Sequence, residues 1–320
     1  MSKEATVNNQ DFPMSYAMHT MRQGKSFNAR ASLRPDESKR YTGELTRVLD
    51  PRLVLSDMMA SNGLVIDLNN LGVITVSTET ISKMTEADVS MSLEPRSSED
   101  ITTYGVQDTP VPVVQKDFRI NTRLLEASRT TGAPLSTEAL TESGIRVADK
   151  IEDGILNGFD IGQRGNRIMG LANTTAASTG SLTAAWDNED QRNIFGDVND
   201  MVKDMVVMNR DGPFVLLVSR NYYIEMQKDY NKNYPSRTFE ERIEADALIS
   251  EVVAVPKLAD GTVILLDANP NTVDLVWGAR PRNIAWSNSP FENHFVTFAA
   301  VAPRIKVNAA GETGIVRYTA

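Results

Sequence analysis

Adjacent carboxylates at Glu152 and Asp153 are the residues of this 320-residue chain whose types could perform acid–base chemistry. Two carboxylates that share such work must flank one reacting bond. The apolar spacing around this pair predicts a helix, and adjacent side chains on a helix point about 100° apart. The pair therefore cannot act on one bond, and we interpret it as the charged end of a solvated or interface helix.

Gly158, Gly162 and Gly165 form a glycine-rich segment of the kind that can bind phosphate. A phosphate-binding loop ends in Gly-Lys-Ser or Gly-Lys-Thr, and that ending is absent here. The glycines also follow a predicted helix instead of a strand, which is the wrong context for dinucleotide binding. We interpret the segment as a flexible helix-to-strand loop and expect no cofactor.

Few residues of this chain could support metal or thiol chemistry. There is no cysteine, which excludes disulfides, thiol catalysis and cysteine-ligated metals. The two histidines, His19 and His294, are too few for a multi-histidine metal site. We therefore expect no metal and no enzyme. The alternative from another functional class is an α+β enzyme whose active site cannot be recognised in the sequence.

The composition indicates a protein that works in a cytoplasm. The formal net charge of -9 argues against a tight hold on a nucleic acid backbone. There is no run of about 18 apolar residues, so we expect no membrane span and no membrane partner. The first residues also lack the apolar core of a signal peptide.

Charge is distributed unevenly along the chain. Residues 12–34 contain four basic residues and no acidic one, whereas residues 67–108 contain eight acidic and two basic residues. We expect the two segments to meet, within or between subunits, although two solvated segments give the same pattern. The candidate contact residues are Arg22, Lys25, Arg30, Arg34, Glu79, Glu86, Asp88, Glu94, Glu99 and Asp100.

The N-terminal third contains two segments with little core of their own. Residues 1–34 have no sustained periodicity but carry several large apolar groups, which favours an arm that contacts protein. Residues 35–60 are predicted to be helical, with a break at Pro51. Residues 62–115 contain short alternating stretches between turn-forming residues, which predicts a long two-stranded excursion. Because a two-stranded ribbon is marginally stable alone, it needs another molecule to lie against.

The rest of the chain predicts helices and strands in α+β order. A helix at 136–158 has a stripe of Leu140, Gly144, Val147, Ile151 and Ile155 and is about 33 Å long. A second helix at 187–209 is capped by Asp187 or Asn188, and Ser219 caps a third. Strands are expected at 213–218, 249–255, 262–266, 272–277 and 283–286, followed by two more between 294 and 320.

Several stretches, taken in order, resemble one protein family. They are VPVVQKDFRINTRLLEAS at 111–128, LSTEALTESGIRVADKIEDGILNG at 135–158, IMGL at 168–171, LISEVVAVPKL at 248–258, DGTVILLDANP at 260–270 and VDLVWGARPRNIAW at 273–286. The chain resembles the major capsid proteins of tailed bacteriophages, whose shell-forming fold is shared with encapsulins. No single stretch is highly specific, and their order and spacing carry the resemblance.

The resemblance implies a particular organisation of this α+β chain. It makes residues 1–34 an N-terminal arm, 62–115 the extended loop and 160–288 the axial domain. The peripheral domain then combines 35–61, 116–159 (with the spine helix) and 289–320. The arm and the extended loop acquire a role, which is to lock neighbouring subunits together.

The resemblance also implies what the chain assembles with. It predicts pentamers and hexamers of an icosahedral shell around double-stranded DNA, located in the virion and assembled in the host cytoplasm. Portal, decoration and separate scaffolding proteins are expected partners, and packaged DNA is contacted weakly and non-specifically. The alternative is an encapsulin-type nanocompartment that encloses cargo enzymes, but the long irregular N-terminus favours the virion.

Some members of this family join neighbouring subunits by a lysine–asparagine isopeptide bond with an acid as the catalyst. The corresponding residue types here are Lys83 in the extended loop and Asn308 with Glu312 near the C-terminus. This cross-link is a hypothesis that the resemblance suggests, since such residues are common on any surface.

Overall fold

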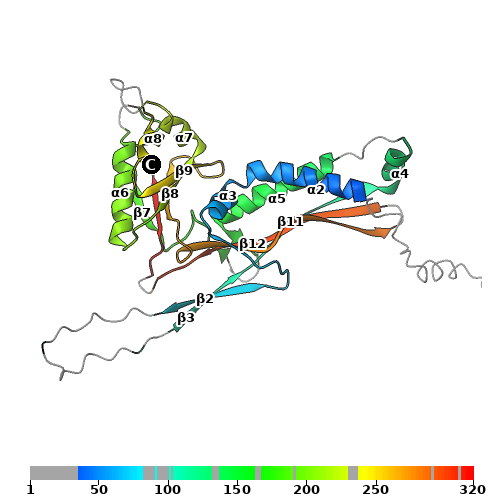
Figure 1. The fold of residues 1–320 in the computed structure, drawn as a ribbon, viewed down its shortest axis with the longest axis horizontal. Coiled ribbons are helices and arrows are strands. Elements are labelled where there is room, and N and C mark those ends of the chain that lie inside the picture. Colours follow the sequence, from blue (N-terminus) through cyan, green and yellow to red (C-terminus); the bar gives the residue numbers. More distant parts are fainter. Residues whose placement is uncertain are drawn as a thin grey trace, which may run out of the picture. The chain divides into compact units, whose positions relative to one another are not determined.

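The computed structural model describes residues 35–81, 91, 101, 104–131, 137–162, 167–189, 192–229, 237–289, 292–308 and 311–320 (Figure 1). The chain divides into two compact units. The first comprises residues up to 48, 115–144 and 282–298, and the second comprises 49–114, 145–281 and 299–320. Several elements contribute residues to both units, among them α5 (Glu138–Asn157), β11 (Val273–Ser289) and β12 (Glu292–Ile305).

The helix predicted at 35–60 is present and breaks at the predicted proline. Helix α2 (Pro35–Leu49) begins at a proline, whose fixed φ suits a first helical turn. The 3-10 turn η1 (Asp50–Arg52) contains Pro51, and helix α3 (Val54–Ser61) follows it. Because Pro51 lacks the backbone N–H that a continuous helix needs, a second helix starts instead.

Aromatic side chains fill the core of the first unit. Strand β4 (Val113–Asn121) contributes Phe118, whose ring stacks on Phe295 of β12 with 5.1 Å between centroids. Tyr41 of α2 packs on the same ring at 5.9 Å, and Leu140 of α5 belongs to the same cluster. Helix α4 (Thr122–Thr131) follows β4 directly.

A four-stranded sheet has the order β1-β11-β12-β4, with the short strand β1 (Val65–Asp67) parallel to β11. The sequence predicts separate strands at 272–277 and 283–286, and this is wrong because β11 runs through both. Pro281 is tolerated inside this strand for a physical reason. Strand β1 pairs with Leu275 to Trp277 alone, so the missing N–H of Pro281 removes no bond to β1.

The second unit is built around a five-stranded mixed sheet of order β7-β13-β10-β8-β9. Strand β10 is antiparallel to both of its neighbours, whereas the outer pairs β13–β7 and β8–β9 are parallel. Every residue of β8 is buried, as its continuous apolar sequence predicts. The strands are β7 (Ser178–Ser181), β8 (Phe214–Ser219), β9 (Ile249–Val255), β10 (Thr262–Asp267) and β13 (Ile315–Thr319).

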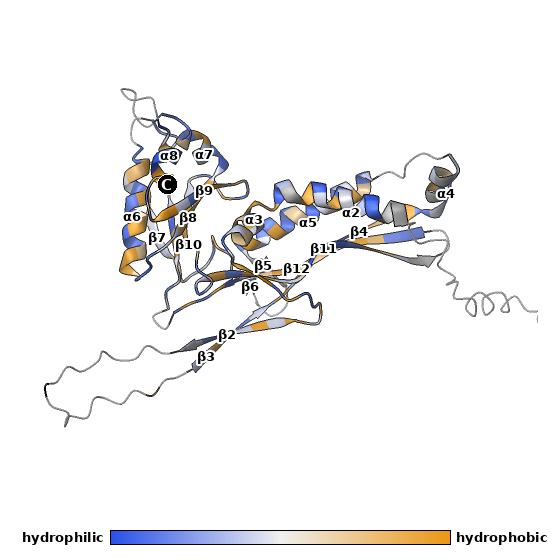
Figure 2. Cartoon of the chain, in the orientation of Figure 1, coloured by the Kyte–Doolittle hydropathy of each residue, from blue (hydrophilic) through white to orange (hydrophobic). Residues whose placement is uncertain are grey.

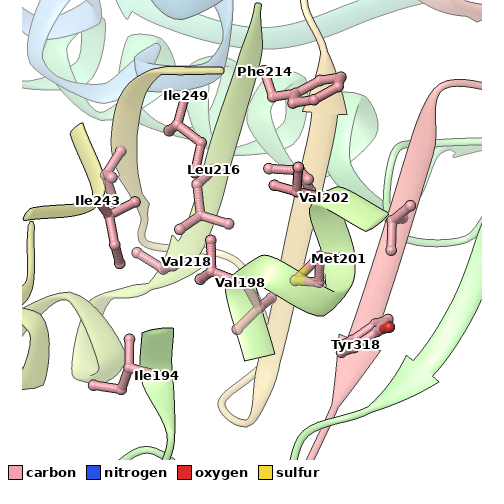
Figure 3. Close-up of a cluster of buried hydrophobic side chains, with 14 of the residues drawn as sticks. Ile194, Val198, Met201, Val202, Phe214, Leu216, Val218, Ile243, Ile249 and Tyr318 are labelled. Carbon is pink, nitrogen blue, oxygen red and sulfur yellow. The ribbon is translucent and has the colours of Figure 1, made fainter. Parts of the chain in front are cut away.

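Three helices contribute side chains to a core on one face of this sheet, and Figure 3 shows part of that core. They are α6 (Ile194–Val207), α7 (Arg220–Met226) and α8 (Phe239–Glu244). Helix α6 alternates between hydrophobic and hydrophilic stretches (Figure 2), and its apolar stripe packs on alternate residues of β8. The predicted stripe of Ile194, Val198, Met201 and Met205 is fully buried, and Met208 packs against its edge.

The predicted caps of these helices are partly right. Ser219 caps α7, because its hydroxyl accepts from the backbone N–H of Tyr222 at 3.4 Å. The expected cap of α6 at Asp187 or Asn188 is wrong, since Asn193 caps it and accepts from Gly196 N at 3.2 Å. Asp197 of this helix instead bonds to Thr183 and Trp186, which come earlier in the chain.

Asp197 lies in the first turn of α6 and is 2% exposed. Its Oδ1 accepts from the backbone N–H and the hydroxyl of Thr183, at 3.0 and 2.6 Å. Its Oδ2 accepts from the indole N–H of Trp186 at 2.9 Å. Asp197 therefore accepts three hydrogen bonds, one of them from the fully buried Trp186 indole, and holds Thr183 and Trp186 against the start of the helix.

We expect Asp197→Ala to lower the free energy of unfolding by roughly 2 kcal/mol, because it leaves the buried indole N–H of Trp186 without an acceptor. Denaturant unfolding followed by tryptophan fluorescence measures this change. The matched control is Asp200→Ala on the same helix, which removes an exposed pair with Lys203 and should change stability by less than about 0.5 kcal/mol. Equal effects of the two variants would contradict the assignment.

The predicted two-stranded excursion is present as a ribbon of β2 (Thr75–Ile81) and β3 (Tyr104–Pro110), which lie side by side (Figure 1). The strands pair in antiparallel register, with Glu79 opposite Val106 and Ser77 opposite Asp108. The alternating residues around Ile66, expected in the excursion, form β1 and pair with β11 instead. The two-stranded part therefore begins at Thr75.

Candidate subunit interface

The two adjacent carboxylates on α5 serve different partners. Asp153 accepts hydrogen bonds from the Lys150 amine at 3.0 Å and from the Asn157 amide at 2.9 Å. Glu152 is 3% exposed and accepts from backbone N–H groups at the start of α3. The interpretation of the pair as a solvated or interface helix end is wrong for Glu152, which is buried inside the chain.

Gly158, the first glycine of this segment, lies at the turn between α5 and a small two-stranded sheet, β5 (Phe159–Asp160) and β6 (Arg167–Ile168). Gly158 has φ of +82°, and a Cβ there would lie 2.0 Å from the carbonyl oxygen of Ile168. The residue is therefore glycine because of a close backbone contact. Gly162 has φ of +65°, and Gly165 lies outside the described residues.

The remaining chemistry-bearing residues form no reactive group in the part of the chain that the structure describes. The His294 ring stacks on Trp286 with 4.6 Å between centroids, and His19 lies outside that part. Within the same residues no three acidic, histidine or cysteine side chains come together as metal ligands. No helix among them is long and apolar enough to cross a bilayer.

Of the ten candidate contact residues, the structure describes Glu79. It lies exposed on β2 of the ribbon. The other nine, Arg22, Lys25, Arg30, Arg34, Glu86, Asp88, Glu94, Glu99 and Asp100, lie outside the described residues. The meeting of the basic and acidic segments therefore stays a prediction.

Side-chain alternation gives the ribbon two different faces. One face carries Glu79 and Asp108 together with two large side chains that are unusually exposed, Tyr104 at 66% and Val106 at 65%. The other face carries Val76, Thr78, Thr80 and Thr109, which are half-buried or buried. We call the first face the acidic–apolar face of the ribbon.

The acidic–apolar face is suited to a partner surface. A tyrosine and a valine with most of their area in water gain free energy when another surface covers them. Ile74, just before β2, is also 75% exposed, but by alternation it belongs to the other face of the ribbon. The two carboxylates on the same face favour a partner that brings positive charge.

A buried ion-pair cluster holds the base of the ribbon. Asp274 of β11 is 1% exposed and accepts two hydrogen bonds from Arg304 of β12, at 2.8 and 2.5 Å. Lys306 lies 2.7 Å from the same carboxylate. A further N–H of Arg304 donates to the backbone oxygen of Ser77 on β2 at 3.5 Å. No signal in the sequence marks this cluster, because Asp274 and Arg304 are 30 residues apart in a chain rich in charged residues.

The structure describes two of the three residues of the hypothetical cross-link, Asn308 and Glu312. The Asn308 amide donates to Glu312 at 3.2 Å, and the backbone N–H of Glu312 donates to the Asn308 side chain at 2.9 Å. The two residues thus form a local turn between β12 and β13. Lys83 lies outside the described residues, so the cross-link stays a hypothesis.

This arrangement of elements matches that of viral shells. The structure is similar to that of a virus-like particle from Pyrococcus furiosus, with a TM-score of 0.58 and 17% identity over 87% of this chain and 99% of that chain. It is also similar to the capsid of Myoviridae phage XM1, with a TM-score of 0.64 and 10% identity over 81% of this chain and 90% of that chain. A chain from Mycobacterium phage Adephagia matches with a TM-score of 0.57 and 12% identity, over 82% of this chain and 89% of that chain.

At these identities the likeness concerns the fold, and the chain has the α+β fold of phage capsid proteins. The fold that the sequence resemblance implied is therefore confirmed. No curated protein matches the sequence. Residues 53–318 match the model of a family described as "Family of unknown function (DUF6260)", and the chain belongs to that family.

Proposed function

We propose that this protein is a structural subunit that assembles with copies of itself into the icosahedral capsid of a tailed bacteriophage and encloses double-stranded DNA. The observation that carries the proposal is the acidic–apolar face of the ribbon on a capsid fold. In an isolated monomer the exposed side chains of Tyr104 and Val106 contribute no free energy of burial, and a two-stranded ribbon is only marginally stable. In a shell, a neighbouring copy covers this face in every subunit.

The proposal gives each segment a role. The arm (1–34) and the extended loop (62–115) interlock neighbours, and the axial domain (160–288) surrounds the five-fold and six-fold positions. The peripheral domain combines 35–61, 116–159 and 289–320. Interlocked contacts of this kind bury roughly 2,000 Å² or more per interface. Portal, scaffolding and decoration proteins are further partners, and DNA is held weakly because the chain carries a net charge of -9.

A nanocompartment shell around cargo enzymes is the second candidate. The similarity to the Pyrococcus furiosus particle supports it, since that similarity extends over 99% of that chain. Both candidates are closed shells without catalytic activity of their own, and they differ in their contents.

The test of the proposed function is size-exclusion chromatography of the purified chain, followed by negative-stain microscopy and absorbance at 260 and 280 nm. Closed shells, or rings of five and six subunits, support a shell protein. Nucleic acid inside favours the virion, and a protein cargo favours the nanocompartment. A monomer or dimer that is stable over a wide concentration range overturns both.

The contact between the basic arm and the acidic loop predicts a salt dependence. If exposed ion pairs join them, raising the salt concentration from about 0.05 M to about 1 M should loosen the shells, because the screening length falls from over 10 Å to about 3 Å. Light scattering during dilution measures the loss of particles. Sucrose at equal osmolality is the control, and unchanged stability at high salt would show that the contacts are apolar or buried.

A further inference from the structure

Helix α3 does not cap its own N-terminus. The residue at its N-cap position is Leu53, which has no side-chain acceptor, and no side-chain bond is made there. The first turn of a helix nevertheless leaves backbone N–H groups without partners, and a buried turn needs acceptors for them. Leu55, in this first turn, is completely buried.

Glu152 of α5 supplies the missing cap from 97 residues away. Its Oε2 accepts from the backbone N–H of Leu55 at 3.1 Å, and its Oε1 accepts from that of Ser56 at 3.3 Å. These are the second and third residues of α3, the positions that an ordinary N-cap side chain serves. The carboxylate therefore joins α3 to α5 through the helix terminus, where negative charge is favoured.

The surroundings of Glu152 provide no compensating cation. Among the described residues Glu152 forms no ion pair, and Asp57 on α3 adds a second negative charge nearby. The neighbouring basic side chains are already engaged, Arg52 with Asp149 at 3.2 Å and Lys150 with Asp153 at 3.0 Å. Glu251 of β9, an acid at the opposite end of α3, accepts from Asn62 at 2.8 Å.

Burial therefore raises the pKa of Glu152 to about 7, and its two backbone hydrogen bonds offset only part of the desolvation. An acid whose pKa is higher in the folded state than in the unfolded state stabilises the folded state. This stabilisation is fully present at pH values below the unfolded-state pKa. This contribution is lost as the pH rises from about 4.5 to about 7.

We propose that Glu152 is a proton-controlled latch that holds the first turn of α3 on α5 when it is protonated and releases it more readily when it is ionised. Release lets water reach the carboxylate, which removes the penalty of burying its charge. Because α3 leads directly into β1 and then the ribbon, the latch controls how firmly the start of the ribbon segment is anchored. This inference does not depend on the proposed shell function.

Amide hydrogen exchange of the full-length chain tests the latch. After correction for intrinsic exchange, the opening constant of the amides in 55–61 should rise on the order of 50-fold from about pH 5 to about pH 8, as linkage predicts for these two pKa values. In Glu152→Gln, which keeps the shape and an acceptor but cannot ionise, the same amides should show no such rise. In Asp153→Asn, the matched control on the next residue, the rise should persist.

Two results overturn the proposal. One is a wild-type opening constant that does not change with pH, and the other is an equal rise in the wild type and in Glu152→Gln. If Glu152→Gln does not fold, infrared spectroscopy of the wild type decides the question. A band from a buried protonated carboxyl at about pH 6 that disappears by about pH 8.5 supports the latch, and its absence refutes it.

Discussion

Replacing Tyr104 and Val106 together with serine is expected to leave the subunit folded and to raise sharply the concentration at which it assembles. Both side chains are about two-thirds exposed, so their loss removes little from the isolated subunit. If a neighbouring copy covers them, each contributes roughly 1.5–3 kcal/mol to every contact. A loss of about 3 kcal/mol or more per contact raises the concentration needed for assembly by more than about 100-fold.

Sedimentation velocity at several concentrations measures this shift, and circular dichroism checks the fold. The matched control is the pair Tyr104→Phe and Val106→Ile, which keeps the apolar area and should still assemble. Particles from the serine variant at the wild-type concentration would show that the acidic–apolar face lies outside the contact.

Asp274→Ala is the second variant with a large expected effect, this time on the fold. Asp274 and Arg304 are buried and joined by two hydrogen bonds, with Lys306 on the same carboxylate. Removal of the carboxylate leaves positive charge in the interior without a partner. Such changes lower the free energy of unfolding by roughly 3–5 kcal/mol. Thermal unfolding of the unassembled subunit measures the loss.

Asp67→Ala provides the control for that variant. Asp67 also receives two hydrogen bonds from an arginine, Arg280, but both side chains are well exposed to water. Removing an exposed pair should lower the free energy of unfolding by about 1 kcal/mol or less. If the two variants lose the same stability, the buried cluster does not hold the base of the ribbon as described.

Local signals in the sequence predicted much of the fold. Pro51 marked the break between α2 and α3, and Ser219 marked the start of α7, because both act through the backbone of their own neighbours. The continuous apolar run of β8 predicted a strand that is buried throughout. The excursion was predicted as two strands, and the ribbon is the part of it that pairs.

Features that depend on distant residues could not be predicted in the same way. The environment of Glu152 is set by the start of α3, and that of Asp274 by Arg304 and Lys306, so spacing along the chain carries no sign of either. The strand β1 looked like part of the excursion because alternation predicts a strand without naming its partner. The acidic–apolar face also required the register of β2 on β3, which decides which side chains share a face.

The position of β13 has a consequence for the timing of folding. This strand, residues 315–319, lies between β7 and β10, and Ile315 and Val316 are completely buried. A ribosome that has released only the first 300 residues has therefore produced a sheet in which β7 lacks its neighbour. Pairing over such long sequence separations is slow, because the chain must close a large loop first. If the chain assembles as proposed, subunits should become competent to associate only after translation of β13, so that synthesis and association are separated in time.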